Sequence, residues 1–563
     1  MRVTYGLDLG TTFTKCALFE GDSRLTVFDL DVEFGADATD VKTRLKGLRS
    51  AVTVAGVAGN RIAYVGSQAI KMREELEKKK LPYRAFEEAK LWIGTDFSQS
   101  QAVEAPPWRF DEHSYEYRPE DVGALVLRAV AREVERVGRP RPEHLVITHP
   151  AQFDSTQQHA TRHAAALAGM AVVDLLTEPE AAAIAYSREI RQDGLYVIFD
   201  LGGGTLDIVL VAIKNRQFRT VRKDGTKIGG RDFDRAVLDA MMHAFDIYSR
   251  GEFRSDMLGP VGELLWLAHA ERVKRRLNEG SSADLGRELQ FEIPFDSTYA
   301  LEAGLRTELL PDSFPFKMSL LDFDRHVEER VTGTRELVEK LLSDEGVAWD
   351  SIQGVISVGG STKLQAVKRM LDEVSKGKVL RNLDPDTVVA QGAAIHAASL
   401  SRQGGQASVV GELIKKTPYR GTLFRSVGLR IETADGTGRL IPLVKKGVIT
   451  PLDVPVEKTC STSQPNQDHI LIQLYEGESP DPEDSDNNFI GECRIEGFPP
   501  TPGLQKVVVR LQIEGNDTKR ITVKLGAFEK EVPIEFDPRK VLDRPQVEAR
   551  RVFLEGLKVQ TGC

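Results

Sequence analysis

The chain has 563 residues, of which 41% are hydrophobic and 28% are charged. This length and composition are typical of a globular protein with roughly two to four domains. The net charge of −9, without a concentrated basic stripe, argues against a general nucleic-acid-binding protein. No apolar run approaches the roughly 20 residues that cross a bilayer. We expect no signal peptide before Tyr5, because the chain already begins with a predicted strand. Four cysteines, Cys16, Cys460, Cys493 and Cys563, lack paired spacing. We therefore expect a cytoplasmic protein in a reducing compartment, without membrane contact, disulfides or structural zinc.

Strand and helix signals alternate along residues 1–400, which predicts an α/β architecture. Apolar runs predict strands at 2–8, 145–149, 195–200, 208–212 and 354–358. Amphipathic periods predict helices at 119–137, 155–168, 232–245, 260–277 and 362–374.

The pattern changes after residue 400. Residues 401–422 contain Ser-Arg-Gln-Gly-Gly-Gln-Ala-Ser and a short basic stretch, which are typical of a linker. Residues 423–525 predict an antiparallel β domain, with period-two strands at 428–432, 439–444, 469–475, 506–513 and 520–523. Residues 526–563 predict a C-terminal tail with one short charged helix at 546–557 and no long helical bundle.

One local pattern occurs twice: an apolar strand ends at an Asp, and a Gly turn with a Thr hydroxyl follows, at residues 5–12 and 197–207. The aspartates Asp8 and Asp200 lie 192 residues apart (200 − 8), about one domain length. Glycine lets backbone N–H groups approach phosphate oxygens, and a strand-end Asp suits Mg²⁺, which keeps its water ligands. One copy alone would equally fit a β-hairpin turn. Two copies make nucleotide hydrolysis the leading hypothesis.

Further motifs follow the first turn in a fixed order. They lie at residues 86–94, 148–151, 178–186, 200–207, 228–234, 271–275 and 358–363. The β domain adds short motifs at 431–433, 466–467, 475–478, 486–488 and 497–500. In order and spacing, residues 1–525 resemble the seventy-kilodalton heat-shock chaperone (Hsp70) family of the DnaK type. The resemblance implies an actin-like ATPase domain of two RNase H-like lobes at 1–400, followed by an antiparallel β-sandwich at 423–525.

The resemblance also implies ATP and Mg²⁺ as ligands and gives roles to particular residues. Asp8, Glu178 and Asp200 would surround Mg²⁺, largely through water. Lys90, Glu178 and Asp207 would orient the attacking water, and with Asp200 they are the catalytic candidates. Such a site transfers a phosphoryl group by positioning and charge neutralisation. Phosphate and adenosine contacts are implied for Gly10, Thr11, Thr12, Phe13, Gly202, Gly203, Gly204, Thr205, Glu271, Lys274, Arg275, Asn278, Gly359, Gly360, Ser361 and Lys363.

Without the family resemblance, each of these side chains could have a purely structural role. Lys90 would be a solvated surface lysine, and Glu178 a carboxylate favoured by a helix N-terminus. The charged residues of 271–275 would form a salt-bridged helix face. His159 and His163 are spaced i, i+4 but lack the glutamate of a His-Glu-x-x-His motif, so we expect a surface helix face.

The chain departs from the family pattern at several places. Gln158 replaces an arginine eight residues after Pro150, and Lys363 replaces the arginine that stacks on adenine, so we expect weaker nucleotide binding. Residues 407–414 replace the acidic-leucine linker, and the helical lid is missing, which predicts faster peptide exchange. Segment 451–466 is two residues longer, so the peptide-pocket residues are not assigned.

The leading hypothesis is an ATP-dependent chaperone that captures extended, apolar segments of unfolded polypeptides and couples capture to the nucleotide. A J-domain co-chaperone and a nucleotide exchange factor are further candidate partners. An actin-like filament protein is an alternative, which the β domain and the motif at 271–275 disfavour. A sugar or carboxylate kinase of the same superfamily is another, which needs an acceptor-binding Asp that the sequence does not identify.

Overall fold

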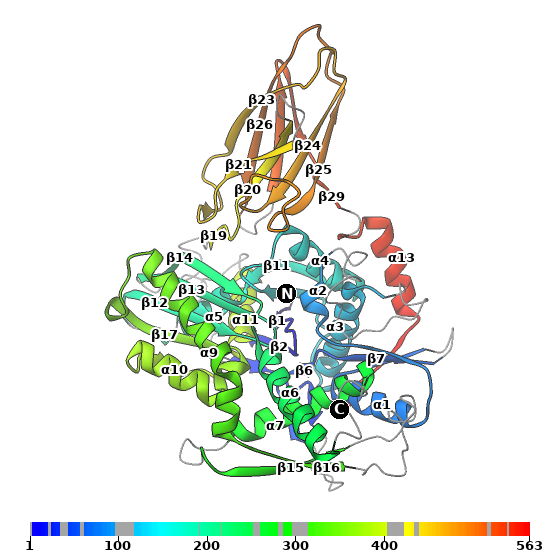
Figure 1. The fold of residues 1–563 in the computed structure, drawn as a ribbon. Helices are drawn as coiled ribbons and strands as arrows, with labels where there is room; N and C mark the ends of the chain where they lie inside the picture. The colour runs from blue at the N-terminus through cyan, green and yellow to red at the C-terminus, as the bar shows by residue number, and fades with distance from the viewer. Residues whose placement is uncertain are drawn as a thin grey trace.

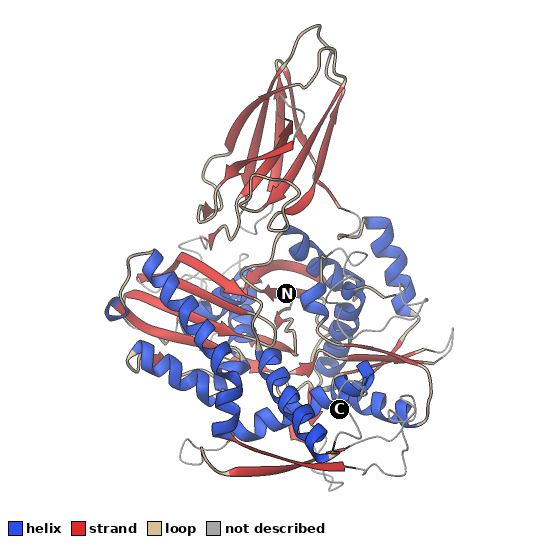
Figure 2. Cartoon of the chain, in the orientation of Figure 1, coloured by secondary structure: helices blue, strands red, loops and turns tan. Residues whose placement is uncertain are grey.

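The computed structural model describes residues 3–20, 24–33, 43–56, 61–95, 117–187, 189–190, 192–214, 217–250, 259–279, 285–294, 313–401, 421–432, 438–514, 519–537 and 540–562. An α/β body made of both helices and strands carries an all-strand unit at one end (Figures 1 and 2). The predicted linker at 401–422 lies almost entirely outside the described residues. No helix within the described ranges is long and apolar enough to cross a membrane.

Two sheets of the same design form the α/β body. In the first, β1 (Thr4–Asp8), β2 (Phe13–Glu20) and β3 (Arg24–Val27) form an antiparallel meander, which β10 (His144–His149) and β11 (Ala171–Thr177) extend in parallel. In the second, the meander is β12 (Gly194–Leu201), β13 (Leu206–Lys214) and β14 (Gln217–Thr226), which β17 (Ile352–Val358) and β18 (Val379–Leu380) extend in parallel. This repeat confirms the predicted α/β fold class. We call the halves built on these sheets lobe I and lobe II.

Helices cover both faces of each sheet, so the central strands are apolar throughout. All five residues of β1 are buried. The outer helices are α3 (Pro119–Arg136) and α4 (Ser155–Leu167) on lobe I, and α6 (Gly230–Tyr248), α9 (Leu320–Asp344) and α10 (Gln365–Ser375) on lobe II. The helices α5 (Glu178–Tyr186) and α11 (Val388–Ser401) pack on each other between the two sheets; α11 lies against β1, β2 and β10 of lobe I, and α5 lies against β12 and β17 of lobe II.

Smaller elements extend each lobe. Lobe I adds β4 (Asp31–Glu33), β5 (Thr43–Leu45), β6 (Leu48–Arg49), β7 (Val52–Ala55), β8 (Ile62–Val65), α1 (Ser67–Lys78), β9 (Tyr83–Phe86) and α2 (Ala89–Trp92). Lobe II adds α7 (Gly259–Asn278), the hairpin of β15 (Glu288–Pro294) and β16 (Ser313–Ser319), and 3-10 turns at Trp349–Ser351 and Gly360–Lys363. The helix predicted at 362–374 begins only at Gln365, because the second 3-10 turn occupies the residues before it.

The all-strand unit is a sandwich of two antiparallel sheets, as predicted. One sheet has the order β21 (Gly438–Val444), β20 (Val427–Glu432), β24 (His469–Glu476), β25 (Asn488–Glu496) and β29 (Glu535–Phe536). The other has the order β23 (Val456–Ser461), β26 (Lys506–Ile513), β27 (Lys519–Leu525) and β28 (Phe528–Val532). A short ladder of β19 (Gly421–Thr422) and β22 (Ile449–Thr450) adjoins them. Alternate residues of β26 are buried between the sheets, which is the period of a half-buried strand. The sandwich continues to Phe536, beyond the expected boundary at residue 525.

The chain then leaves the sandwich and returns to lobe I. The helix α13 (Arg544–Glu555), which begins two residues before the predicted 546–557 helix, packs against α4 and α3 (Figure 1). The strand β30 (Lys558–Gln560) pairs in parallel with β8 and becomes an edge of the small lobe I sheet. The sequence did not predict that the C-terminal tail joins lobe I.

Candidate nucleotide-binding cleft

The acidic candidates lie at the ends of the central strands of the two lobes. Asp8 is the last residue of β1, and Asp200 is the penultimate residue of β12. Asp207 stands directly opposite Asp200 in the antiparallel pair of β12 and β13. All three side chains are buried. In both lobes the first strand of the meander ends at an aspartate just before the Gly turn. The repeated sequence pattern therefore places its carboxylates at the boundary of the lobes.

The two Gly turns face each other closely. A Cβ atom on Gly203 of the second turn would lie 2.2 Å from Thr12 Oγ1 of the first turn. The second turn is closed by a hydrogen bond from the Gly202 N–H to the Thr205 carbonyl oxygen (2.9 Å). A larger residue at Gly203 would force the Thr12 side chain of the first turn out of its place.

Lys90 and Glu178 form a buried ion pair, so Lys90 is not a solvated surface lysine, whereas Glu178 does lie at a helix N-terminus. Lys90 belongs to α2, and Glu178 is the first residue of α5. Both residues are only 8% exposed. Burial raises the pKa of Glu178, and the Lys90 ammonium opposes that rise. The pair therefore holds a charged ammonium and a carboxyl group of raised proton affinity beside the strand-end aspartates.

The carboxyl groups of Asp200 and Asp207 have too few positive charges and hydrogen-bond donors around them to stabilise their ionised forms. Burial, followed by the charge of Glu178, raises the pKa of Asp200 well above its usual range and that of Asp207 to about 8. Asp200 Oδ2 is buried and has no hydrogen-bond partner among the described residues. A hydrated divalent cation would satisfy this oxygen and compensate the clustered charge, so these residues fit Mg²⁺. Within the described ranges no three His, Cys, Asp or Glu side chains converge as direct metal ligands.

Asp8 has a different environment from the other two aspartates. Its Oδ2 lies 3.3 Å from Lys15 Nζ on β2, and its Oδ1 lies 3.5 Å from Thr148 Oγ1 on β10. Asp8, Asp386 and Glu178 raise the pKa of Lys15 despite its burial. Lys15 lies in the strand directly after the first turn, outside every motif of the sequence.

The helix α7 supplies the charged residues of the next wall. Glu271 pairs with Arg49 of lobe I, and Lys274 Nζ lies 2.7 Å from Asp234 Oδ1 of α6. Lys274 also donates to the Gly230 carbonyl oxygen (3.0 Å). Thr11, Thr12, Arg49, Glu88, Asp234 and Glu271 line one pocket between the lobes. Arg275 is exposed on the same helix.

The turn after β17 completes the candidate site. Gly359 has a φ of 82°, and a Cβ there would lie 2.3 Å from the Leu201 carbonyl oxygen. Ser361 Oγ donates to the Gly202 carbonyl oxygen (2.8 Å), which ties this turn to the second phosphate turn. Asn278 Oδ1 accepts from the Gln365 N–H (2.8 Å). The structure thus brings these segments, far apart in sequence, to the same side of lobe II.

Lys363 is held by neighbouring carboxylates. Its Nζ lies 2.9 Å from Asp384 Oδ1 and also pairs with Asp386. A Cβ on Gly360 would lie 2.6 Å from Asp386 Oδ1, so these acidic side chains closely cover the turn. An ammonium fixed in this way presents no planar surface to a base.

Two partners in this region were missed from the sequence. Asp234 lies inside the quoted motif at 228–234, which could have indicated it. Arg49 lies in no motif, and its contact with Glu271 spans 222 residues. No local pattern could have predicted that pair.

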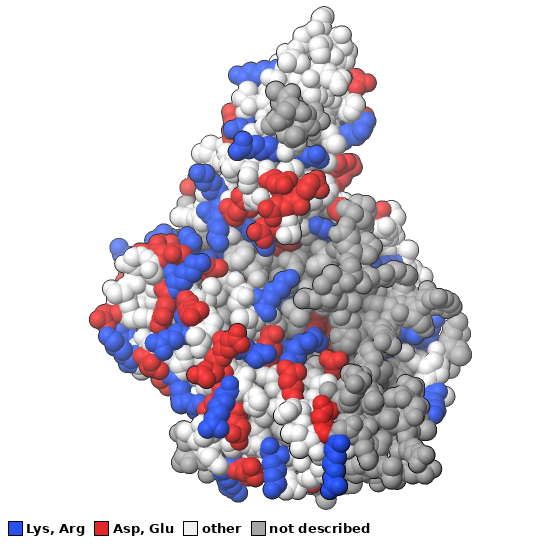
Figure 3. Space-filling view, in the orientation of Figure 1, with Lys and Arg blue, Asp and Glu red and all other residues white. Residues whose placement is uncertain are grey.

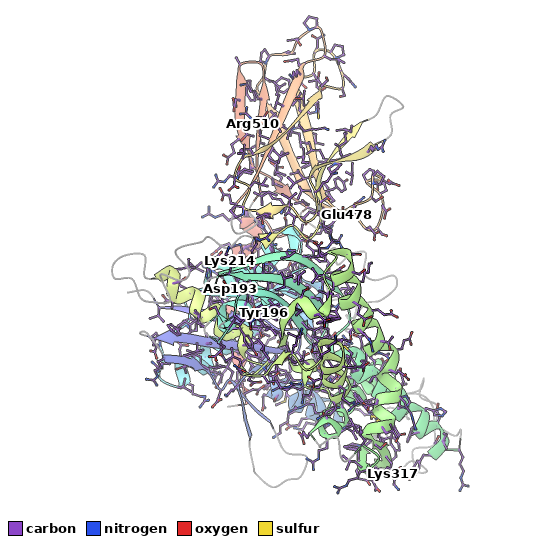
Figure 4. All side chains as sticks on the ribbon, turned by 90° about the vertical axis from the view of Figure 1, so that its left-hand side faces the viewer. Asp193, Tyr196, Lys214, Lys317, Glu478 and Arg510 are labelled. Carbon is purple, nitrogen blue, oxygen red and sulfur yellow. The ribbon has the colours of Figure 1, made fainter. Side chains whose placement is uncertain are left out.

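A buried polar contact joins the sandwich to lobe I. Lys519 Nζ of β27 lies 2.9 Å from Glu476 Oε1 and donates to Ser155 Oγ (2.6 Å). Glu476 also accepts from the N–H of Ser155 (3.2 Å), the first residue of α4, where the helix dipole favours a carboxylate. Asn488 Nδ2 donates to Asp154 Oδ2 (2.8 Å). Figure 4 shows Glu478 at the end of the sandwich that faces the body, whereas Arg510 lies farther away.

The expectation of a surface helix face at His159 and His163 is wrong. The ring centroid of His159 lies 4.1 Å from that of Phe536 in β29, and both histidines are half-buried. This face of α4 is covered because the sandwich docks on it. Gln158 is buried in the same helix, and its Nε2 lies 3.4 Å from the Phe153 carbonyl oxygen. Among the described residues on the face seen in Figure 3, Lys and Arg are interspersed with Asp and Glu and form no continuous basic stripe.

Together, the fold and the cleft define a two-lobed α/β protein with facing phosphate-type turns, joined to a β-sandwich. The "Hsp70 protein" family model matches residues 80–555. "Chaperone protein DnaK" of Deinococcus proteolyticus is 28% identical over 97% of this chain and 81% of its own length. "Chaperone protein DnaK" of Thermus thermophilus is 28% identical over 97% of this chain and 82% of its own length. "Heat shock 70 kDa protein" of Emericella nidulans is 28% identical over 93% of this chain and 76% of its own length. The chain belongs to the Hsp70 family.

Proposed function

We propose that the protein is an ATP-dependent chaperone that hydrolyses the β–γ phosphoanhydride bond of ATP in the cleft between the lobes. The observation that carries this proposal is the meeting of the two Gly turns beside four buried acidic residues. Family membership supports a chaperone over a filament protein or a small-molecule kinase. The proposed units are an ATPase domain at 1–400, a linker at 401–422 and a substrate-binding sandwich from 423 that extends past the expected end at 525 to Phe536, followed by the rest of the predicted C-terminal tail at 526–563.

In this proposal the cleft residues hold the metal ion or orient the attacking water, and Glu178 does both. Asp8, Glu178 and Asp200 hold Mg²⁺ through water, and the ion neutralises charge on the phosphates. Lys90, Glu178 and Asp207 orient the attacking water. A cation bound at this cluster favours the ionised carboxylate of Asp207, which can then receive the proton of the attacking water.

The remaining cleft residues bind the nucleotide. Thr11, Thr12, Thr205 and the turn glycines Gly10, Gly202, Gly203 and Gly204 bind the phosphates, together with the backbone at Phe13. The wall formed by Glu271, Lys274, Arg275 and Asn278 and the turn at Gly359, Gly360, Ser361 and Lys363 bind the adenosine. Because its ammonium is held by two aspartates, Lys363 contributes charge instead of stacking.

The sandwich captures extended, apolar segments of unfolded polypeptides through backbone hydrogen bonds and side-chain pockets. Its contact with α4 at Glu476 and Lys519 is the route by which the cleft affects capture. A J-domain co-chaperone and a nucleotide exchange factor are proposed as partners on family grounds alone.

Slow ATP turnover, measured with and without an unfolded polypeptide, tests the proposal. We expect turnover that rises with the polypeptide, and a loss of at least about 100-fold in Lys90→Met, because removing a positioned catalytic group costs at least this much. ADP binding should remain in this variant, which separates a catalytic defect from unfolding. Turnover that requires a small acceptor molecule would support a kinase instead. ATP-induced light scattering would support a filament protein.

A further inference from the structure

The end of the chain is built into lobe I. Residues 540–562, which we call the C-terminal clasp, include α13 and β30. Leu542, Leu554, Leu557 and Val559 of the clasp belong to the same buried cluster as the central strands of lobe I. The pairing of β30 with β8 aligns Val559 with Ala63. Apolar burial and strand pairing both indicate a stable part of the fold.

Polar contacts from α3 reinforce this anchorage. Arg550 Nε of α13 lies 2.9 Å and 3.0 Å from the carboxylate oxygens of Asp121, whose side chain has no exposed surface. Arg128 donates to the Leu554 carbonyl oxygen and to that of Leu557 (3.1 Å) at the C-terminal end of α13. A cation at this end of a helix is favourable. Releasing the clasp would break this buried ion pair and expose the apolar surface that the clasp covers.

An aromatic contact connects the clasp to the segment that carries Lys90. The ring of Phe553 in α13 lies 5.5 Å from that of Tyr117, and Tyr117 lies 5.3 Å from Phe86 (centroid distances). Phe86 ends β9, four residues before Lys90. The clasp is therefore packed on lobe I near the cleft and is not a loose tail.

The connection between the sandwich and the clasp is short. Phe536 is the last residue of the last sandwich strand, and Leu542 is already in the lobe I core. The six Cα-to-Cα steps between them (542 − 536) span at most about 22 Å. Along this path, Lys540 Nζ donates to Asn488 Oδ1 of the sandwich (2.6 Å). Asn488 in turn contacts Asp154 of lobe I.

We propose that the C-terminal clasp is a second covalent tether that keeps the β-sandwich beside lobe I in every nucleotide state. The sandwich is attached at its start through the linker and at its end through the clasp. While the clasp stays folded on lobe I, breaking the contact of Lys519 with Glu476 allows only small movements. Coupling between the cleft and the sandwich then works by local rearrangement at α4, not by separation of the two units. This proposal holds whether or not the chain hydrolyses ATP.

A two-by-two comparison of variants tests the tether. Lys519→Met weakens the contact between sandwich and lobe I. A Gly/Ser insertion of about 24 residues after Asp537 leaves the clasp intact but gives the connection a mean reach of roughly 30 Å. The same insertion appended after Cys563 controls for the added disordered residues. The radius of gyration is measured by small-angle X-ray scattering without nucleotide, with ADP and with ATP.

We expect Lys519→Met alone to remain as compact as the wild type in all three conditions. Lys519→Met with the insertion after Asp537 should expand by several Å relative to Lys519→Met with the insertion after Cys563. If Lys519→Met without any insertion expands as much as Lys519→Met with the insertion after Asp537, the proposal is overturned, because the clasp would not be holding the sandwich. Absence of expansion in the doubly altered protein would also overturn it, because the tether would not limit the movement.

Hydrogen–deuterium exchange provides a second readout that does not depend on these variants. In the wild type, amides of β8, α13 and β30 should stay protected to the same degree without nucleotide, with ADP and with ATP, because a paired edge exchanges slowly. Loss of protection at β8 and β30 together in any of these states would show that the clasp opens. That result would contradict the proposal.

Discussion

Replacing Asp207 with asparagine should change how the stability of the α/β body depends on pH. Burial, and then the charge of Glu178, raises the pKa of Asp207 from 3.8 to about 8. Between about pH 4 and pH 8, the folded state therefore keeps a proton that the unfolded state has lost. The free energy of unfolding consequently falls as pH rises, by up to about 1.4 kcal/mol per pH unit. Asparagine cannot ionise, so Asp207→Asn removes this contribution.

Urea denaturation followed by tryptophan fluorescence, without nucleotide or Mg²⁺, measures the effect. From pH 5 to pH 7 the stability of Asp207→Asn relative to the wild type should rise by up to about 3 kcal/mol. Asp239→Asn, at an exposed position of α6, is the matched control and should follow the wild type. Saturating Mg²⁺ and ADP should flatten the wild-type dependence, because the cation favours the ionised carboxylates. Identical pH dependence in the wild type and Asp207→Asn would refute the reasoning.

Further predictions concern the turns, the metal and the sandwich contact. Gly203→Ala should lower ADP affinity at least about tenfold by calorimetry, because its Cβ would lie 2.2 Å from Thr12 Oγ1, whereas Gly333→Ala, where a Cβ has open space, should not. Removing Mg²⁺ with a chelator should also weaken ADP binding, and unchanged affinity would argue against a metal at this cleft. Lys519→Met leaves Glu476 buried without its cation and should destabilise the docked sandwich by about 3–5 kcal/mol in urea titrations. Adding Glu476→Gln should restore part of that loss, and a lack of any recovery would argue against charge burial as the cause.

Local chemistry explains which parts of the site the sequence could predict. The turns after Asp8 and Asp200 need an apolar strand, a carboxylate and glycines in direct succession, so the pattern is visible in a short window. The alternating burial of β26 is likewise visible within eight residues. The roles of Lys90 and Glu178 came only from the family resemblance, because burial of a lysine depends on what the rest of the chain places around it.

The missed elements have three different causes. α11 is apolar on all sides because it lies between the two sheets, so it has no amphipathic period. α9 does carry a signal, since Leu320, Phe323 and Val327 follow a helical spacing behind the N-cap Ser319, and a stricter search would have found it. β30 has three residues and pairs with a strand almost five hundred residues earlier, which no local pattern specifies. Tertiary contacts of this kind account for most of what the sequence did not predict.

The central claim is that ATP in the cleft controls capture of polypeptide by the sandwich. The most direct test is the dissociation rate of a fluorescently labelled, extended apolar peptide after mixing with ATP or with ADP. We predict faster release with ATP than with ADP in the wild type, and loss of this difference in Lys519→Met, which breaks the contact with α4. Equal release rates with both nucleotides in the wild type, under conditions in which both are bound, would contradict the account.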